Sequence, residues 1–314
     1  MATQQTEKAA PTAHSQGNRL EQRASEGDAR GRLLAGIPVT ERRLELAGIS
    51  TAILEGGEGL PIVLMHGPGE SAANWRWVMA DLVDTHHVIA PDLPAHGATA
   101  GSDEVLDADR VLAWLGELVE RSCGSSPALV GHVLGGAIAA RFAIASPGQL
   151  SRLVLVDTLG LARFRPSPRF AFALATFAAR PSERRYDRFM RQCAYDLDSL
   201  RVRMGEEWEP FAAYNIELAR SQQAKAAGRL LRKLGLPRIP SEELAGIELP
   251  TTLIWGRHDR ANRLSIAEAA SERYAWPLHV IDEAADDPIR DQPQAFVRAV
   301  RAALGQREAK SGRG

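Results

Sequence analysis

Residues capable of acid–base or nucleophilic chemistry stand directly after short apolar runs of the chain. His66 follows the run PIVLM, His132 follows ALVG, and Asp259 stands shortly after TTLIW. Short apolar runs of this kind are typical of buried strands, and open α/β sheets bind ligands beyond the carboxyl ends of their strands. These three residues therefore indicate a candidate site built from loops at one edge of a sheet.

The sequence contains no pattern for a metal or a dinucleotide. The carboxylates at Asp282, Asp286 and Asp287 lack the spacing of a metal-ligand set, and no G-x-G-x-x-G motif follows a strand pattern. Two cysteines, Cys123 and Cys193, are too few for a metal tetrad or a disulfide framework. We therefore expect no metal and no cofactor.

Short apolar runs alternate with helical patterns along most of the chain. This alternation predicts an α/β fold with a mostly parallel, doubly wound sheet. Between about residues 160 and 245 only helical patterns occur, which predicts a helical cap inserted over the carboxyl ends of the strands. The expected strands are Arg43–Ala47, Thr51–Glu55, Pro61–Met65, His87–Ala90, Ala128–Gly131, Leu153–Val156, Thr251–Trp255 and Leu278–Ile281, and the main expected helices outside the cap are Asn74–Val83, Val105–Arg121, Gly135–Ala145 and Pro293–Leu304.

The composition of the chain limits the classes of partner and the cellular compartment that we expect. The 314 residues include 38 Lys plus Arg and 39 Asp plus Glu, and a net charge of −1 gives no reason to expect nucleic acid or a membrane as partner. The most apolar run, Phe170–Ala179, is far shorter than the ~20 residues of a membrane span. The N-terminus lacks an apolar signal core, so we predict a cytoplasmic protein, whose oligomeric state the sequence does not indicate. The predicted segments are a disordered tail at 1–32, a core at 33–159 and 247–306, the cap at 160–246, and a second disordered tail at 307–314.

Five motifs in order along the chain resemble the α/β-hydrolase superfamily, in particular its capped esterases, epoxide hydrolases and C–C hydrolases. Gly131-His132-Val133-Leu134-Gly135 stands where that family has the G-x-S-x-G nucleophile elbow, a sharp turn between a strand and a helix. The other four are the oxyanion-loop element His66-Gly67, the loop 91–97, the strand end 255–259 and the helix start 292–296. The resemblance covers about residues 40 to 306 and implies the family's fold, with the site at the elbow.

The sequence departs from this family at the catalytic positions. Val133 stands at the nucleophile position, and a valine has neither the lone pair nor the acidic proton needed to form an acyl-enzyme. A β-branched residue also suits the elbow poorly, so either the turn has relaxed or its surroundings hold it at a cost of ~1–3 kcal/mol. The family's histidine position falls on Asp286, or on Asp287 if the register shifts by one. Only Asp259 matches the triad, as its acid, and we predict a degenerate triad.

The oxyanion loop departs from the family as well. The family uses the backbone N–H of the residue after His66-Gly67, and here that residue is Pro68, which has no N–H. The N–H of Leu134 can serve as the other donor, and a shifted loop can offer Gly69. Losing one such donor costs a serine hydrolase ~3–4 kcal/mol of transition-state stabilisation.

The resemblance places Asp259 and Asp286 face to face. Two carboxyl groups that close cannot both ionise cheaply, so they are expected to share a proton near neutral pH and to serve as a general acid or base. Alternatively, Asp286 is solvated or pairs with an arginine such as Arg290. His132 is a further candidate for catalysis, although His132 and His66 also suit hydrogen-bonded structural roles.

Three functions follow as hypotheses. The first is an atypical, non-hydrolytic enzyme that acts on a hydrophobic small molecule by acid–base chemistry in a capped pocket. The second is a pseudohydrolase that binds a ligand without turnover, and the third is a hydrolase with a substitute nucleophile. The aromatic residues of the cap suit a hydrophobic ligand but can equally pack the cap on the core; they are Phe164, Phe170, Phe172, Phe177, Tyr186, Phe189, Trp208, Phe211 and Tyr214. The arginines around Phe170–Ala179 suit either an interfacial helix or a solvated surface.

Overall fold

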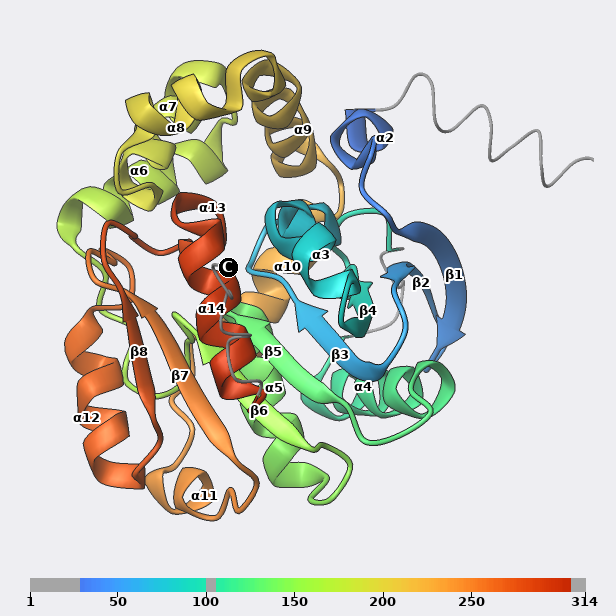
Figure 1. Ribbon diagram of the computed structural model, residues 1–314. Coiled ribbons are helices and arrows are strands. Elements are labelled where there is room, and N and C mark those ends of the chain that lie inside the picture. Colours follow the sequence, from blue (N-terminus) through green and yellow to red (C-terminus); the bar gives the residue numbers. More distant parts are fainter. Residues whose placement is uncertain (1–28, 100–105, 306–314) are drawn as a thin grey trace, which may run out of the picture.

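The apolar runs form one eight-stranded sheet in the computed structural model, which describes residues 29–99 and 106–305 (Figure 1). The strand order is β1-β2-β4-β3-β5-β6-β7-β8; β2 pairs antiparallel with β1 and β4, and all other pairs are parallel. This arrangement confirms the predicted α/β class and mostly parallel sheet. The strands are β1 (Thr40–Leu46), β2 (Ile49–Gly56), β3 (Leu60–Met65), β4 (His86–Pro91), β5 (Ala128–His132), β6 (Arg152–Val156), β7 (Thr251–Gly256) and β8 (Leu278–Ile281).

Helices cover both faces of the sheet, and its central strands are therefore buried on both sides. Every residue of β5 and β7 is buried, as expected for parallel strands between two helical layers. On one face lie α3 and α14, and on the other lie α4, α5 and α12 (Figure 1). These elements are η1 (Ala72–Trp75), α3 (Arg76–Val83), α4 (Ala108–Ser122), α5 (Leu134–Ala145), α12 (Leu264–Tyr274), α13 (Pro288–Asp291) and α14 (Pro293–Ala303). Helix α4 begins at Ala108 rather than at Val105, because the Asp107 carboxylate accepts a hydrogen bond from the Arg110 N–H and caps the helix.

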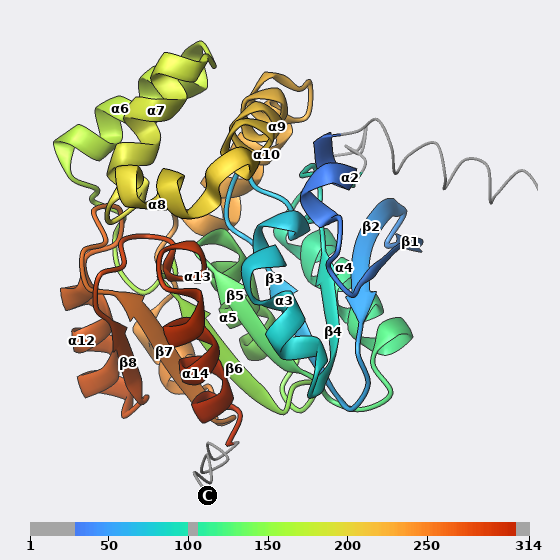
Figure 2. The ribbon, with the colours of Figure 1, turned by 45° about the horizontal axis from the view of Figure 1, so that its top comes forward.

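The insertion between β6 and β7 is helical, and its first helices lie beyond the carboxyl ends of the strands (Figure 2). Helices α6 to α9 build an apolar cluster of their own around Phe177, Trp208 and Phe211. The later elements instead pack on the core beside α5, through Leu230, Leu234 and other apolar residues. The elements are α6 (Pro168–Ala179), α7 (Glu183–Cys193), α8 (Leu197–Met204), η2 (Gly205–Glu207), α9 (Trp208–Arg220), α10 (Ala224–Leu230), the π-helical turn η3 (Leu231–Gly235) and α11 (Ser241–Ala245). No helix in the described ranges is both long enough and apolar enough to cross a membrane.

A short N-terminal helix, α2 (Ala29–Leu34), joins the core to the cap. Buried Arg30 forms an ion pair of 3.0 Å with Asp92, which follows β4, and donates a hydrogen bond of 3.2 Å to the hydroxyl of Tyr214 on α9. Leu33 packs into the cap cluster. The predicted tail at 1–32 is therefore wrong for its last four residues, because apolar and charged contacts hold them in a helix. The rest of that tail, and the tail at 307–314, lie outside the described residues.

Candidate active site

The turn at Val133 keeps the strained backbone of a nucleophile elbow. Val133 has φ 47° and ψ −101°, although its side chain is β-branched, and it lies between the end of β5 and the start of α5. Of the two outcomes considered, the turn has not relaxed. A conformation of this kind costs about 1–3 kcal/mol and persists only where the surroundings fix it.

Close packing and hydrogen bonds fix this turn. A Cβ on Gly135 would collide with the carbonyl oxygen of Met65, and one on Gly131 would collide with Gly135. The Val133 N–H donates to Val156 O at 2.9 Å, and the Val133 carbonyl accepts from the N–H groups of Ala137 and Leu159, both at 3.2 Å. The backbone of the elbow therefore depends on its glycines and on the sheet, and not on the side chain that it presents.

Three carboxyl groups gather where β6, β7 and β8 end. Asp157 directly follows β6 and is completely buried, and Asp259 follows β7 and is also buried. Asp286 follows β8 and is half-buried, with its Oδ1 shielded from solvent. The Asp157 Oδ1 accepts a hydrogen bond from the Gly256 N–H at 3.0 Å, and the Asp259 Oδ1 accepts from Ala261 and Asn262 at 2.6 and 2.8 Å. Neighbouring parallel strands thus bring the three acids to one edge of the sheet.

Burial and mutual repulsion hold protons on this cluster. Burial, followed by the charge of Asp259, raises the pKa of both Asp157 and Asp286. Burial also raises the pKa of Asp259 to about 7, against the opposing effect of its hydrogen bonds. The Oδ2 atoms of Asp157 and Asp259 are both buried without a hydrogen-bond partner in the described residues, and the charge of Asp259 contributes to the raised pKa of Asp157. The raised pKa values of these coupled groups therefore favour a proton on the cluster near neutral pH.

His132 lies beside this cluster as a charged imidazolium. Its Nε2 is 2.7 Å from the carbonyl oxygen of Asp286, and its Nδ1 is 3.5 Å from Oε2 of Glu70. Both ring nitrogens thus face acceptors. Burial alone would lower the pKa of His132, but the hydrogen bond and charge of Glu70 outweigh it and raise that pKa to about 9. A histidine that keeps its proton at neutral pH cannot act as a general base there, so this geometry favours a positioning role.

The loop after β3 is held in place by internal hydrogen bonds. The Gly67 N–H donates to Glu70 at 2.8 Å, and Pro68 offers no N–H. His66 is buried and structural: its Nδ1 lies 2.8 Å from Gly67 O, and its Nε2 accepts from the Leu93 N–H at 3.0 Å. The N–H of Leu134 has no hydrogen-bond acceptor in the part of the chain that the structure describes. Of the two expected oxyanion donors, the structure leaves the Leu134 N–H available.

The contacts of Arg290 distinguish Asp286 from Asp287, the two residues that could stand at the family's histidine position. Buried Asp287 forms an ion pair of 3.0 Å with Arg290 and caps α13 by accepting the Arg290 N–H. Asp286 is therefore the residue that lies with Asp259, in the position that the resemblance assigns to a histidine. Asp286 itself is half-buried, and the ion pair that Arg290 forms is with Asp287, although the charge of Arg290 also opposes the rise in the pKa of Asp286.

The elbow is accessible, but two hollows in the cap do not border it. Val133 and Asp286 each keep part of their surface accessible, so small molecules reach both side chains. Hollows of about 500 and 370 Å³ lie in the cap, but neither is lined by Val133, Asp259 or Asp286. Most cap aromatics fill the cap cluster instead of lining a pocket; the buried ones are Phe170, Phe177, Tyr186, Trp208, Phe211 and Tyr214. Phe172, by contrast, is not buried in the cap cluster, since 61% of its surface is exposed.

The acids do not form a metal site. Within residues 29–99 and 106–305, no three His, Cys, Asp or Glu side chains are arranged to hold a metal ion. Cys193, at the end of α7, is buried, and burial, followed by the charge of Asp286, raises its pKa well above the usual range. Since the thiolate is the reactive form, Cys193 is a poor substitute nucleophile.

Sequence reasoning missed two residues of the site. Asp157 belongs to none of the five motifs, although its place at the end of β6, beside β7, marks it as a neighbour of Asp259 and a possible alternative acid position. Glu70 carried no signal, because its contact with His132 depends on a loop that folds back through Gly69 at φ 73°. Ser71 occupies the N-cap position of η1, but its hydroxyl makes no capping hydrogen bond.

A sequence model described as the alpha/beta hydrolase family matches residues 62–299. The chain belongs to the alpha/beta hydrolase family. Over 132 residues it is 36% identical to 2-hydroxymuconate semialdehyde hydrolase from Pseudomonas sp. strain CF600, which covers 40% of this chain and 45% of that relative. The chain thus matches less than half the length of this relative. Over 270 residues it is 25% identical to pimeloyl-[acyl-carrier protein] methyl ester esterase of Aeromonas hydrophila, covering 82% of this chain and all of the esterase.

Solved structures share the fold of this alpha/beta hydrolase. The meta-cleavage product hydrolase CumD from Pseudomonas fluorescens IP01 has a TM-score of 0.73 at 23% identity, covering 86% of this chain and 99% of that one. A bacterial membrane phospholipase A has a TM-score of 0.75 at 23% identity, covering 93% and 97%. These relatives confirm the predicted resemblance and the fold. Hydrolases and esterases are therefore the homologues of this chain.

Proposed function

We propose that the protein is a capped α/β-hydrolase-fold enzyme that transfers protons on a hydrophobic small molecule without a nucleophile. The observation that carries this proposal is the cluster of Asp157, Asp259 and Asp286 beside Val133, whose carboxyl groups have raised pKa values. A general acid or base works best when its pKa lies near the working pH, and Asp259 meets that condition. Ser-His-Asp hydrolysis lacks its nucleophile, because Val133 occupies the position of the serine at the elbow.

The site favours a substrate with a carbonyl group. Removal of a proton next to a carbonyl places negative charge on the carbonyl oxygen, and the free N–H of Leu134 is a suitable donor to that oxygen. The carboxyl cluster takes the proton from carbon and returns it at another position. The reaction class is therefore tautomerisation, isomerisation, cyclisation or dehydration. Relatives named for hydrolysing 2-hydroxy-6-oxo dienoates act on conjugated carbonyl compounds, which supports this substrate class.

Solvent exchange tests the proposal directly. The protein is incubated in D₂O with a panel of apolar ketones and conjugated enols, and deuterium at carbon is followed by NMR. We expect exchange with the wild type and a loss of about 10²-fold or more in Asp286→Asn, the size of a general acid–base contribution. The matched control is Asp282→Asn, an exposed aspartate four residues away, which should exchange like the wild type.

Other outcomes identify the competing functions. Saturable binding of a panel member without exchange in any variant contradicts the proposal and indicates a pseudohydrolase. Labelling of the wild type by a fluorophosphonate probe would also contradict the proposal, because the label would reveal a nucleophile and indicate a hydrolase. Exchange that survives in both Asp286→Asn and Asp259→Asn shows that the carboxyl cluster is not the base.

A further inference from the structure

The first cap helix exposes an apolar face. Helix α6 has no charged residue between Arg169 and Arg180. One side packs Phe170, Ala173 and Phe177 into the cap cluster, and the other side is turned to solvent. The exposed side consists of Phe172 and small residues; the small residues are Ala171, Ala175, Ala178 and Ala179, with partly exposed Thr176 among them.

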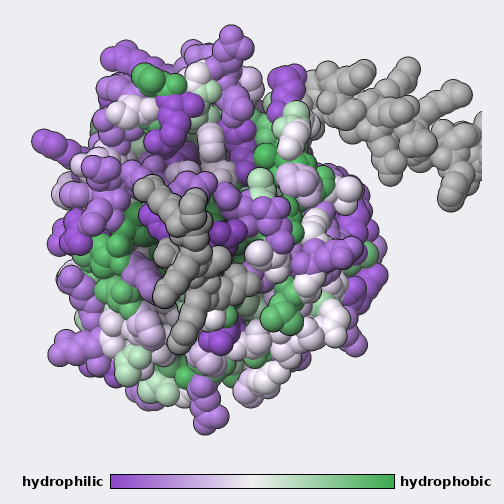
Figure 3. All heavy atoms as spheres, in the orientation of Figure 1, coloured by the Kyte–Doolittle hydropathy of each residue, from purple (hydrophilic) through white to green (hydrophobic). Residues whose placement is uncertain are grey.

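This face lacks the polar residues of an ordinary surface helix. Helices on protein surfaces place charged or polar residues opposite their buried stripe, and helices that are apolar all round are normally covered. The hydroxyl of Thr176 adds little polarity, because it donates to the carbonyls of Phe172 and Ala173 within the helix. In the view of Figure 3, the surface of the cap is mostly hydrophilic.

Arginines surround this face. Residues 163–191 contain eight arginines and two acidic residues, a local charge of +6 on a chain whose net charge is −1. In the described ranges, salt-bridge partners occur only for Arg191 among the eight. Arg188 lies over the ring of Phe172 at 5.9 Å, so charge and apolar surface are adjacent. The other seven arginines are Arg163, Arg165, Arg169, Arg180, Arg184, Arg185 and Arg188.

The basic, apolar surface borders one hollow of the cap. Arg184 lines the hollow of about 370 Å³, together with Tyr186 of α7 and Trp208 of α9. Tyr186 lies close enough to Arg290, Asp287 and Glu70 for their charges to act on its hydroxyl. The hollow therefore lies on the arginine-rich side of the cap, where Glu183, Asp187 and Glu209 also line it.

We propose that α6 and its flanking arginines dock on an anionic lipid bilayer, with Phe172 inserted among the acyl chains. Interfacial helices combine an apolar face with basic residues in this way. An acidic protein or a nucleic acid would use the arginines but would leave Phe172 and the alanines without a role. The expectation of no membrane partner rested on the net charge of the whole chain, −1, which does not reveal the local charge of +6 in residues 163–191. Docking would place the mouth of the hollow where apolar substrates collect.

Vesicle binding tests this surface. Full-length protein is sedimented with vesicles of phosphatidylcholine alone, and with vesicles that also contain phosphatidylglycerol. We expect binding to the anionic vesicles only, weakened by salt. The double variant Arg169→Gln/Arg180→Gln should bind about 25-fold more weakly, from about fivefold per arginine. Phe172→Ser should lose about tenfold, because less apolar surface enters the bilayer.

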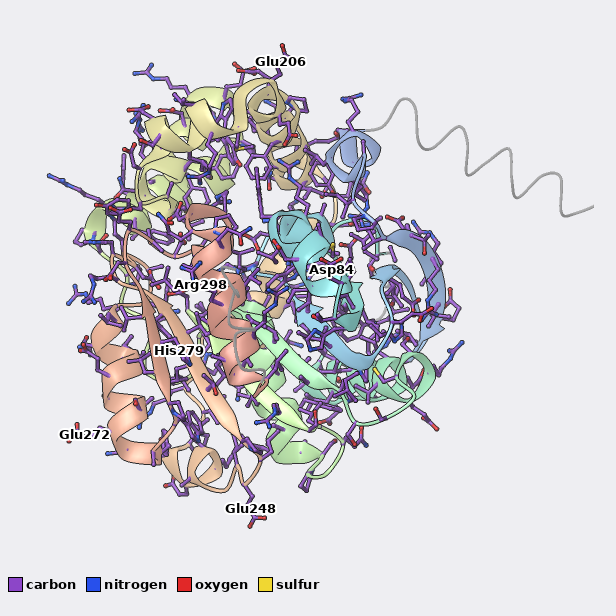
Figure 4. The ribbon with its side chains drawn as sticks, viewed as in Figure 1. Asp84, Glu206, Glu248, Glu272, His279 and Arg298 are labelled. Carbon is purple, nitrogen blue, oxygen red and sulfur yellow. The ribbon has the colours of Figure 1, made fainter. Side chains whose placement is uncertain are left out.

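Matched controls separate this surface from general effects. Arg273→Gln/Arg298→Gln removes two exposed arginines on α12 and α14, and Arg298 lies on α14 away from the cap (Figure 4). Leu60→Ser removes an apolar residue that is 73% exposed at the start of β3. Both should bind like the wild type. The proposal fails if neutral vesicles bind equally, if controls and cap variants behave alike, or if polyglutamate competes fully and Phe172→Ser has no effect.

Discussion

The elbow at Val133 and the strand ends at Asp157, Asp259 and Asp286 differ in what they retain of a hydrolase. The elbow keeps its backbone, with a positive φ fixed by glycines and strand contacts, and lacks a reactive side chain. The strand ends lack the histidine but carry a third carboxyl group, and their carboxyl pKa values are raised. Backbone geometry in this fold is thus set independently of the chemistry that it presents.

The largest expected effect comes from restoring the missing side chains together. If the elbow backbone is intact, Val133→Ser/Asp286→His should regain ester hydrolysis and react with a fluorophosphonate probe. We expect the double variant to hydrolyse p-nitrophenyl acetate about 10²-fold faster than Val133→Ser alone, which has a hydroxyl but no neutral imidazole to activate it. Equal rates for the two variants would show that the turn no longer directs residue 133 into a working site.

A smaller effect should follow when the backbone of the elbow is disturbed. Gly135→Ala forces a Cβ against the Met65 carbonyl, and we expect the free energy of unfolding to fall by about 3 kcal/mol. Urea denaturation measures the change. The control is Gly124→Ala, since a Cβ there meets no atom within 4 Å. A similar stability for both variants would contradict the role assigned to close packing.

The smallest expected effect concerns the pH dependence of stability. The pKa of Asp259 is about 7 in the folded protein and about 4 when unfolded. The folded state therefore binds more protons between these values, and the free energy of unfolding falls as the pH rises from 4 to 7. Asp259→Asn removes this loss and should be more stable than the wild type by about 2 kcal/mol at pH 8, roughly half of the full linkage, because Asp157 and Asp286 retain part of the proton sharing.

The same variant should show little advantage at pH 4, where the wild-type carboxyl group is protonated in the folded state and about half protonated in the unfolded state. Thermal unfolding at the two pH values measures the difference, and Asp282→Asn serves as the exposed control. A stabilisation that is equal at both pH values would mean that packing, and not proton binding, causes it.

The sequence predicted the fold and part of the site for different physical reasons. Apolar runs and glycines report the sheet and the elbow directly, and the end of a parallel strand places Asp259 near Asp286 without knowledge of side chains. The contact of Glu70 with His132 depends on how one loop folds back, and the exposure of Phe172 depends on which side of α6 meets the cap cluster. Both are tertiary choices that periodicity does not encode.

The guanidinium group of Arg30 connects the cap to the core. Arg30 contacts residues 62 and 184 positions away along the chain, one in the core and one in the cap. Swinging the cap outward would separate Tyr214 from Asp92, so α2 must either travel with the lid or release one of these two partners. One side chain of α2 therefore ties the cap to the core.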